Sequence, residues 1–389
     1  MKRISLLILA LILVLGAAAC APAQESPLSE TPAADIPAGD TVICSIGDAT
    51  LLRSDFEVLF NVYFNQYAQS GYDMTNEANV KALQDAVFNS MVRAEVIYQQ
   101  AVAQGITLTA DEETKTATTA QAQYDSLYGD YIKDAKSEGA ADTQARATEL
   151  FLADLDKNGF TLETFMAQLQ EDIRKSMMAE KLETAVTAAV TFTEEDALVR
   201  FPEDTEADRT AFAEDVSRFD AAQNAYDANG GIPPLYVPEG YVRVKHILVA
   251  DEETALSLID RIQAGEDFDA LMTEYGTDPG MQAEPNMSLG YLMSKNTNFM
   301  PEFKEAGLAL ENVGDISAPV ATDYGYHIIK LVAKLESGAR EFAQVKDDYI
   351  AGTLALLKAE EFETQVASWT DALNITSYIG RIRDLGKTK

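Results

Sequence analysis

The sequence predicts an α+β protein, in which a small strand-rich domain is combined with a mainly helical one. Apolar residues recur at helical spacing through most of residues 41–200. Residues 241–335 instead mix short helices with strands rich in Val, Ile and Tyr. Helical spacing returns after Gly338, in a segment whose apolar stripe has to be buried against another element. These three observations predict the fold class.

The helical domain of residues 41–200 is expected to open with a short strand, TVICSIGDA, followed by its first helix. Ser54 and Glu57 have the spacing of a capping box, so we expect that helix to begin at Ser54. Thr109 and Glu112 predict a later helix start in the same way. The first helix has one wide apolar face: Phe56, Leu59, Phe60, Tyr63, Phe64 and Tyr67. Such faces are usually core, and they can also form an apolar groove for another polypeptide.

Composition marks the boundaries in the rest of the chain. Residues 21–40 carry a proline at every fifth position from Pro22 to Pro37, which is typical of a solvated tether. Residues 201–240 are acidic and then rich in turn formers, in NGGIPPLYVPEG, so we interpret them as a linker. Residues 336–380 are predicted to form a C-terminal helix that packs back onto the helical domain.

The first twenty residues have the features of a targeting signal. Lys2 and Arg3 precede an apolar segment that is shorter than a membrane span, and small residues then lead to Cys20. The end of this stretch, LGAAAC, resembles a bacterial lipoprotein signal. That resemblance implies a signal peptide over residues 1–20, acylation of Cys20 (for instance with palmitate), and a body anchored to the cell membrane on its extracytoplasmic side. The alternative is ordinary secretion, with cleavage among the alanines.

Charge and cysteine content exclude several classes of protein. The formal net charge is -33, so nucleic acid is not an expected partner, because phosphate binding needs clustered Lys and Arg. We interpret the charge as a determinant of solubility. Cys44 is the only other cysteine, which leaves no disulfide framework and no cysteine-based metal site. Cys44 is expected to pack in a strand as a small apolar residue.

The chain has two histidines, and both fall in predicted strands. In YVRVKHILVA, alternation places His246 on one face with Val244 and Leu248. In DYGYHIIKLVA, His327 shares its face with Ile329. A histidine on an apolar face is often only a satisfied core residue. Two such histidines in one small domain favour a functional site.

Residues 241–335 contain, in order, VKHILV, AGEDFDALMTEYGTD, LGYL, MPEFKEAGLAL and VGDISAPVATDYGYHIIK. This ordered set resembles a parvulin-type peptidyl-prolyl isomerase (PPIase) domain. The whole chain resembles extracytoplasmic foldases of the PrsA and SurA kind, in which N-terminal helices and a C-terminal helix form a chaperone domain. The resemblance implies rotation about X-Pro bonds without a cofactor, in an apolar pocket that grips the proline.

The parvulin resemblance also implies the residues of the site. His246 and His327 would meet on the inner side of the sheet, with Thr322 beside them and Asp278 near the carbonyl of the rotating bond. The substrate-binding positions correspond to Leu289, Phe299, Met300, Phe303 and, on the rim, Tyr324. We do not expect a metal at His246, His327 and Asp278, because the sequence offers no evident fourth ligand.

Three hypotheses for the function follow. The first is a membrane-anchored foldase that combines isomerase and chaperone activity on newly secreted polypeptides with X-Pro bonds. The second is a chaperone alone, whose catalytically weak or inactive parvulin domain binds clients. The third is a solute-binding lipoprotein, for which the sequence shows no two-lobed α/β repeat.

Overall fold

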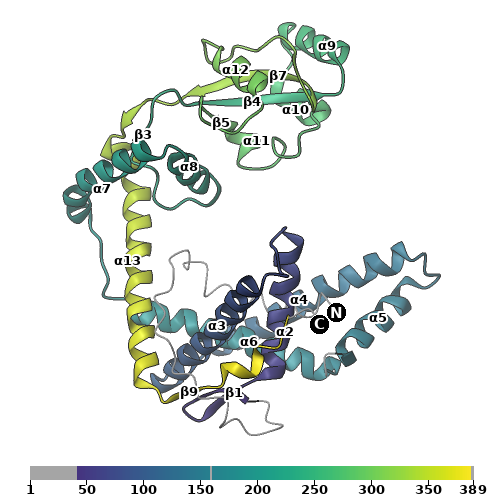
Figure 1. The fold of residues 1–389 in the computed structure, drawn as a ribbon, viewed down its shortest axis with the longest axis vertical. Helices are drawn as coiled ribbons and strands as arrows, with labels where there is room; N and C mark the ends of the chain where they lie inside the picture. The colour runs from purple at the N-terminus through teal and green to yellow at the C-terminus, as the bar shows by residue number, and fades with distance from the viewer. Residues whose placement is uncertain (1–41, 158–159, 387–389) are drawn as a thin grey trace. The chain divides into compact units, whose positions relative to one another are not determined.

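The computed structural model describes residues 42–157 and 160–386. The chain divides into two compact units (Figure 1). Of the described residues, those up to Ala189 and those from Lys358 onward form the first unit, and Val190–Leu357 form the second. The α+β class predicted from the sequence is confirmed. Among the described residues, no helix combines the length and the apolar character needed to cross a membrane.

The first unit is built from helices and one small antiparallel sheet, in the order β2-β1-β9. Its strands are β1 (Val42–Ile46), β2 (Ala49–Leu52) and β9 (Ile375–Ser377). Its helices are α2 (Arg53–Gln69), α3 (Glu77–Ala103), α4 (Ala110–Ser137), α5 (Thr143–Lys157) and α6 (Leu162–Val186). Cys44 pairs with Ser377 across β1 and β9, and it is fully buried, as its packing in a strand predicted. A strand from each end of the described chain thus completes this sheet.

The helix starts only partly follow the sequence prediction. The capping box of Thr109 and Glu112 is present at the start of α4. The predicted box at Ser54 is wrong, because α2 already begins at Arg53 and has no side-chain cap. The Glu57 carboxylate instead pairs with the Arg53 guanidinium, which also pairs with Asp384 far along the chain. The apolar face of α2 is mainly core: Phe56, Leu59 and Phe60 are buried.

The second unit begins with helices where the sequence analysis predicted a linker. Residues 201–240 hold most of α7 (Glu194–Glu214), all of α8 (Ser217–Asn229) and β3 (Tyr236–Val237). The apolar content of this stretch is low, and Pro202 lies inside α7, so its helical pattern is weak. Phe212 and Phe219 nevertheless bury their rings against each other and against Tyr241. This aromatic contact gives the acidic stretch a core.

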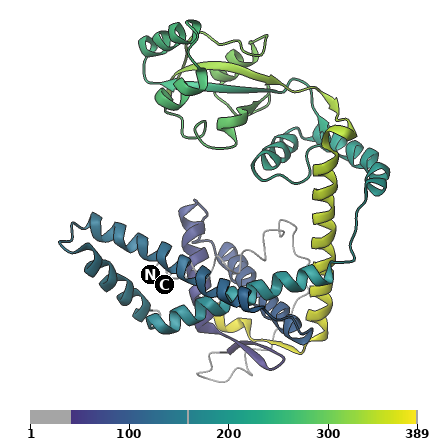
Figure 2. The ribbon, with the colours of Figure 1, turned by 180° about the vertical axis from the view of Figure 1, so that it is seen from behind.

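The rest of the second unit is a four-stranded antiparallel sheet in the order β5-β4-β7-β6, surrounded by short helices (Figure 2). The strands are β4 (Val242–Val249), β5 (Tyr291–Met293), β6 (Val320–Thr322) and β7 (Gly325–Lys334). The helices are α9 (Glu252–Gln263), α10 (Phe268–Tyr275), α11 (Asn286–Leu289) and α12 (Pro301–Leu308). A separate two-stranded pair joins β3 to β8 (Gly338–Ala339).

Alternation along the two central strands of this sheet separates two apolar clusters. Ile247 and Ile328 lie in one cluster, together with side chains of α9 and α10. Val244 and Ile329 lie in the other, together with Phe303 of α12. The face that the sequence analysis assigned to the two histidines is therefore the face covered by α12.

The C-terminal helix α13 (Phe342–Ala372) contributes to both units. Near its start, Val345 and Tyr349 pack in the second unit with Leu235. Further along, Phe362 and Val366 pack in the first unit with residues of α3 and α6. The segment predicted over residues 336–380 therefore packs on the helical domain with its second half, and its first half belongs to the second unit.

Two helical glycines predict opposite effects of the same substitution. A Cβ at Gly352 of α13 would lie 2.6 Å from Ile232 Cγ1 and 2.8 Å from the Gly231 carbonyl carbon. Gly352→Ala should therefore lower the free energy of unfolding, by about 1–3 kcal/mol. At Gly129 of α4 a Cβ meets nothing within 4 Å, so Gly129→Ala should raise it by about 1 kcal/mol. Urea unfolding of both variants measures the difference, and a Gly352→Ala protein as stable as the wild type would contradict the packing.

Candidate active site

The two histidines meet on neighbouring strands of the sheet. His246 on β4 and His327 on β7 bring their Nδ1 atoms within 2.9 Å. The ring centroids are 5.0 Å apart and the planes differ by 19°, so the two imidazole planes are nearly parallel. Both side chains are buried, with exposed fractions of 3% and 6%. A hydrogen bond of ordinary length thus joins two rings inside an apolar layer.

Hydrogen bonds extend this pair at both ends. Thr322 Oγ1, at the end of β6, lies 2.8 Å from His327 Nε2. Asp278 Oδ2, in the loop after α10, lies 2.8 Å from His246 Nε2. The four residues that the parvulin resemblance implied for the catalytic positions therefore form one continuous chain of hydrogen bonds.

The proton positions in this chain follow from its acidic end. Asp278 is an acceptor when ionised, so His246 must donate from Nε2. With both rings neutral, His246 Nδ1 then accepts from His327 Nδ1, and His327 Nε2 accepts from the Thr322 hydroxyl. The Thr322 hydroxyl oxygen in turn accepts from the Tyr324 backbone N–H at 3.2 Å. Each ring nitrogen then has a partner without either ring carrying charge.

Asp278 is held by three donors. Besides His246, the Tyr291 hydroxyl donates to Oδ2 at 2.8 Å and the Gly280 backbone N–H donates to Oδ1 at 2.9 Å. The bond from His246, with those from Tyr291 and Gly280, lowers the pKa of Asp278 to about 2, although partial burial opposes the shift. Asp278 is therefore ionised at neutral pH, with its carboxylate still 24% exposed.

Tyr291 was missed as a site residue by the sequence analysis, which used LGYL only as a strand. Its role depends on a close approach, because a Cβ at Gly280 would lie 2.3 Å from the Tyr291 hydroxyl. The glycine therefore lets the loop carry Asp278 against the start of β5. A tyrosine at a strand start followed by apolar residues was the available signal, and it does not say which carboxylate the hydroxyl would meet.

Aromatic side chains cover the histidines. The Phe303 ring of α12 lies 5.0 Å from each imidazole ring, between centroids, and meets both at steep angles. Phe299 packs on Phe303 and on Tyr291, and Met300 joins the same apolar cluster. Three of the five predicted substrate-binding residues are thus brought together beside the histidines.

The other two predicted substrate-binding residues are more exposed. Leu289 ends α11 with 39% of its surface exposed, and Tyr324 lies in the turn between β6 and β7 with 73% exposed. Neither belongs to the apolar cluster around Phe303. Tyr324 is exposed, as expected of a rim residue. The assignment of Leu289 to substrate binding stays a prediction.

Two further predictions concern metals and the lipid anchor. Within residues 42–157 and 160–386, no group of three or more His, Cys, Asp or Glu side chains is arranged to hold a metal ion. Cys20, together with the predicted signal peptide and tether, lies outside the described residues.

The protonation of His327 can be tested directly. Burial and the neighbouring His246 ring lower the pKa of His327 to about 4, from an ordinary value of 6.5. Between about pH 6.5 and 4, His327 is therefore protonated in the unfolded chain and neutral in the folded chain. The free energy of unfolding consequently falls as the pH drops through that window, and His327 has no such effect above it. An NMR titration of the imidazole carbons should show a His327 midpoint near 4, with His246→Gln providing the assignment. A midpoint at or above 6.5 would contradict the conclusion that the buried His327 ring is neutral.

Residues 246–333 match the family model of the PPIC-type PPIase domain, also called rotamase. The foldase protein PrsA of Clostridium acetobutylicum is 24% identical over 381 residues, which cover 96% of each chain. PrsA of Clostridium botulinum is 30% identical over 224 residues, which cover 58% of this chain and 57% of that protein.

A shorter match has a higher identity. PrsA of Halalkalibacterium halodurans is 43% identical over 96 residues, which cover 25% of this chain and 28% of that protein. The matched domain contains the described hydrogen-bonded chain from Thr322 to Asp278. The chain is therefore a PrsA-like parvulin foldase, with a peptidyl-prolyl isomerase domain in its second unit.

Proposed function

We propose that this foldase is anchored outside the cytoplasmic membrane by a lipid on Cys20, and that it speeds X-Pro rotation in newly secreted polypeptides. The observation that carries the catalytic part is the hydrogen-bonded chain Thr322–His327–His246–Asp278 beneath the side chains of Phe299 and Phe303. The first unit binds the same clients through its helices.

The reaction requires only that a rotational barrier be lowered. An X-Pro bond rotates past a barrier of about 18–20 kcal/mol that arises from amide resonance. At the top of the barrier the bond is twisted and the carbonyl oxygen carries less negative charge than in the planar amide. A dry apolar surface therefore favours the twisted form over the planar one. An acceleration of about a thousandfold requires a barrier lower by only about 4 kcal/mol.

Two parts of the site supply this preference in the proposed mechanism. Phe299, Met300 and Phe303 receive the proline ring and exclude water. The ionised carboxylate of Asp278 lies near the substrate carbonyl and disfavours the resonance form with negative charge on oxygen. His246 and Tyr291 act as positioning residues, because they hold Asp278 by hydrogen bonds.

The chaperone-only alternative is not favoured. It requires a parvulin domain whose site is degraded, whereas the four implied catalytic positions hold functional side chains in one connected geometry. The described sheet of residues 242–334 likewise has four antiparallel strands rather than a parallel two-lobed arrangement, which removes the basis for a solute-binding lipoprotein.

The anchoring part of the proposal is supported by the sequence alone. The apolar segment, the small residues in LGAAAC and the proline-spaced stretch of residues 21–40 together suit a lipidated cysteine followed by a tether. Stable anchoring requires two acyl groups, or one acyl group together with a second membrane-binding signal. Attraction to anionic headgroups is not that second signal, because the protein is too acidic.

The isomerase mechanism predicts which variants lose activity. In a protease-coupled assay on an Ala-Pro peptide, Asp278→Asn should lower kcat/KM by about tenfold or more, because it removes the charge near the carbonyl. His246→Ala should act in the same direction by releasing Asp278. Asp260→Ala, at an exposed position of α9, is the matched control and should retain full activity. Equal rates from the wild type and buffer would leave only the chaperone alternative.

Anchoring predicts a difference between the two cysteines. With the full chain expressed in a bacterial host, Cys20→Ala should abolish incorporation of labelled palmitate and move the protein from the membrane fraction to the soluble one. Cys44→Ala should leave both unchanged, because Cys44 is buried in β1. Membrane retention of an unlabelled wild-type protein would count against lipidation.

A further inference from the structure

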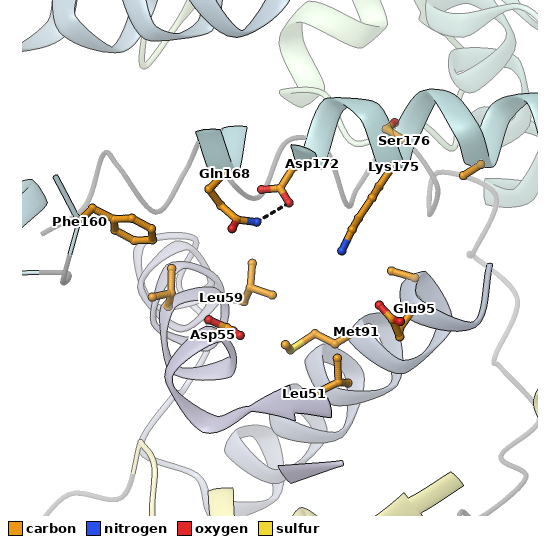
Figure 3. Close-up of a pocket in the computed structure, with 13 residues that line it drawn as sticks. Leu51, Asp55, Leu59, Met91, Glu95, Phe160, Gln168, Asp172, Lys175 and Ser176 are labelled. Carbon is orange, nitrogen blue, oxygen red and sulfur yellow. Dashed lines mark hydrogen bonds between the residues drawn. The ribbon is translucent and has the colours of Figure 1, made fainter. Parts of the chain in front are cut away.

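The first unit contains a pocket of about 280 Å³ that the isomerase mechanism does not use (Figure 3). Helices α2, α3 and α6 form its sides, with Leu51 of β2 and Phe160 beside them. Pockets for small ligands measure about 300–1,000 Å³, so this one suits one or two side chains rather than a folded segment. The pocket lies wholly within one compact unit.

The floor of the pocket is apolar. Leu59, Met91 and Ala179 are buried there, and Leu51 and Val58 complete the surface with partly exposed side chains. A thioether and branched aliphatic groups adapt to the methylene groups of a guest. The floor alone would accept any apolar side chain.

The walls of the pocket are acidic. Three helices each supply one carboxylate: Asp55 from α2, Glu95 from α3 and Asp172 from α6. Within the described part of the chain, these carboxylates form no ion pair. Figure 3 shows Asp55 and Asp172 on opposite sides of the space, with Gln168 bonded to Asp172. The acidic groups therefore surround the pocket from different elements.

One carboxylate oxygen of Asp172 has no hydrogen-bond donor. Gln168 donates to Oδ1 at 2.8 Å, whereas Oδ2 is buried and has no hydrogen-bond partner. Burial, with smaller effects of Glu171 and Asp55, raises the pKa of Asp172 to about 6, although the Gln168 hydrogen bond and Lys175 oppose the shift. Desolvation by the surrounding helices also raises the pKa of Asp55, whose side chain remains exposed, and Lys175 opposes this shift too. A buried acceptor without a donor costs free energy that a suitable guest would recover.

Lys175 is the single cation among the residues that line the pocket, and it does not neutralise them. Its ammonium lies over the Tyr98 ring, 4.7 Å from the centroid, and forms no ion pair with a described carboxylate. With Asp172 ionised, the lining carries three negative charges and one positive charge. The pocket is thus a negative region around an apolar floor.

We propose that this pocket binds a basic side chain, arginine above lysine, of an extended client polypeptide. The proposal rests on client binding by the first unit. The aliphatic stem of an arginine lies along apolar surface while its head stays polar. The planar guanidinium donates to two carboxylates at once, which suits acidic groups on different helices and the unpartnered Oδ2. The neighbouring residues of the client would need no particular charge.

The test uses the full chain and proline-free ten-residue peptides that are identical except for a central Arg, Gln or Glu. Without proline the peptides give the isomerase site no substrate. Calorimetry at pH 7.5 should show the Arg peptide binding about tenfold tighter than the Gln peptide, and the Glu peptide weaker than both. Asp172→Asn should reduce the advantage of Arg over Gln to about twofold or less and leave the Gln peptide unchanged.

Two further variants make the test specific. Lys175→Gln removes the competing cation and should strengthen binding of the Arg peptide, whereas an anion-binding pocket would respond in the opposite direction. Asp156→Asn makes the same chemical change at an exposed position of α5 and should alter nothing. Asp172→Asn should melt no lower than the wild type, because it removes a buried charge that lacks a partner.

The outcomes separate this inference from the proposed function. Binding of all three peptides with equal affinity, unaffected by Asp172→Asn, would overturn the pocket assignment and leave client binding intact. Failure of the wild type to bind any peptide would overturn client binding by the first unit, and the pocket assignment with it. Unchanged Ala-Pro isomerase activity in Asp172→Asn would show that the loss is confined to the first unit.

Discussion

The hydrogen bond between His246 and His327 is the contact on which the isomerase site depends, because it allows two imidazoles to be buried without charge. A charged ring in this apolar layer would be costly, and two would repel each other. The hydrogen-bonded pair avoids that cost, because each group from Thr322 to Asp278 donates to the next one and both rings stay neutral. This series of hydrogen bonds ends on the partly exposed carboxylate of Asp278, where solvent can stabilise the negative charge. The buried imidazoles thus hold the Asp278 carboxylate in place.

The sheet makes this arrangement possible. β4 and β7 are its central strands, and their register places His246 opposite Ile329 and His327 opposite Leu248. The two histidines are therefore diagonal neighbours on one face, close enough for large side chains to meet. Phe303 covers both rings from α12. The same aromatic layer forms the apolar surface to which the proposed mechanism assigns the proline ring of the substrate.

Much of this site could be predicted from the sequence, in part because the strand pattern is local. Period-2 alternation predicted that each histidine lies on an apolar strand face, whereas the meeting of His246 with His327 and the positions of Asp278 and Thr322 were implied by the parvulin resemblance. Interactions that depend on tertiary structure could not be predicted in this way. The Tyr291 bond to Asp278 depends on a loop whose path the sequence does not show. Arg53, the first residue of α2, pairs with Asp384 far along the chain, and the helices of residues 201–240 are stabilised by a few widely spaced aromatic residues. The acidic pocket exists only where three helices converge.

The pairing of β1 with β9 has a consequence for synthesis of the protein. The second unit occupies an uninterrupted stretch, Val190–Leu357, so the ribosome has made all of it before the last part of the chain exists. The first unit has no such independence, because its N-terminal strand waits for Ile375–Ser377 to complete the sheet. The part that catalyses rotation can therefore fold before β9 has been synthesised, whereas the sheet of the first unit is complete only when Ile375–Ser377 pair with β1.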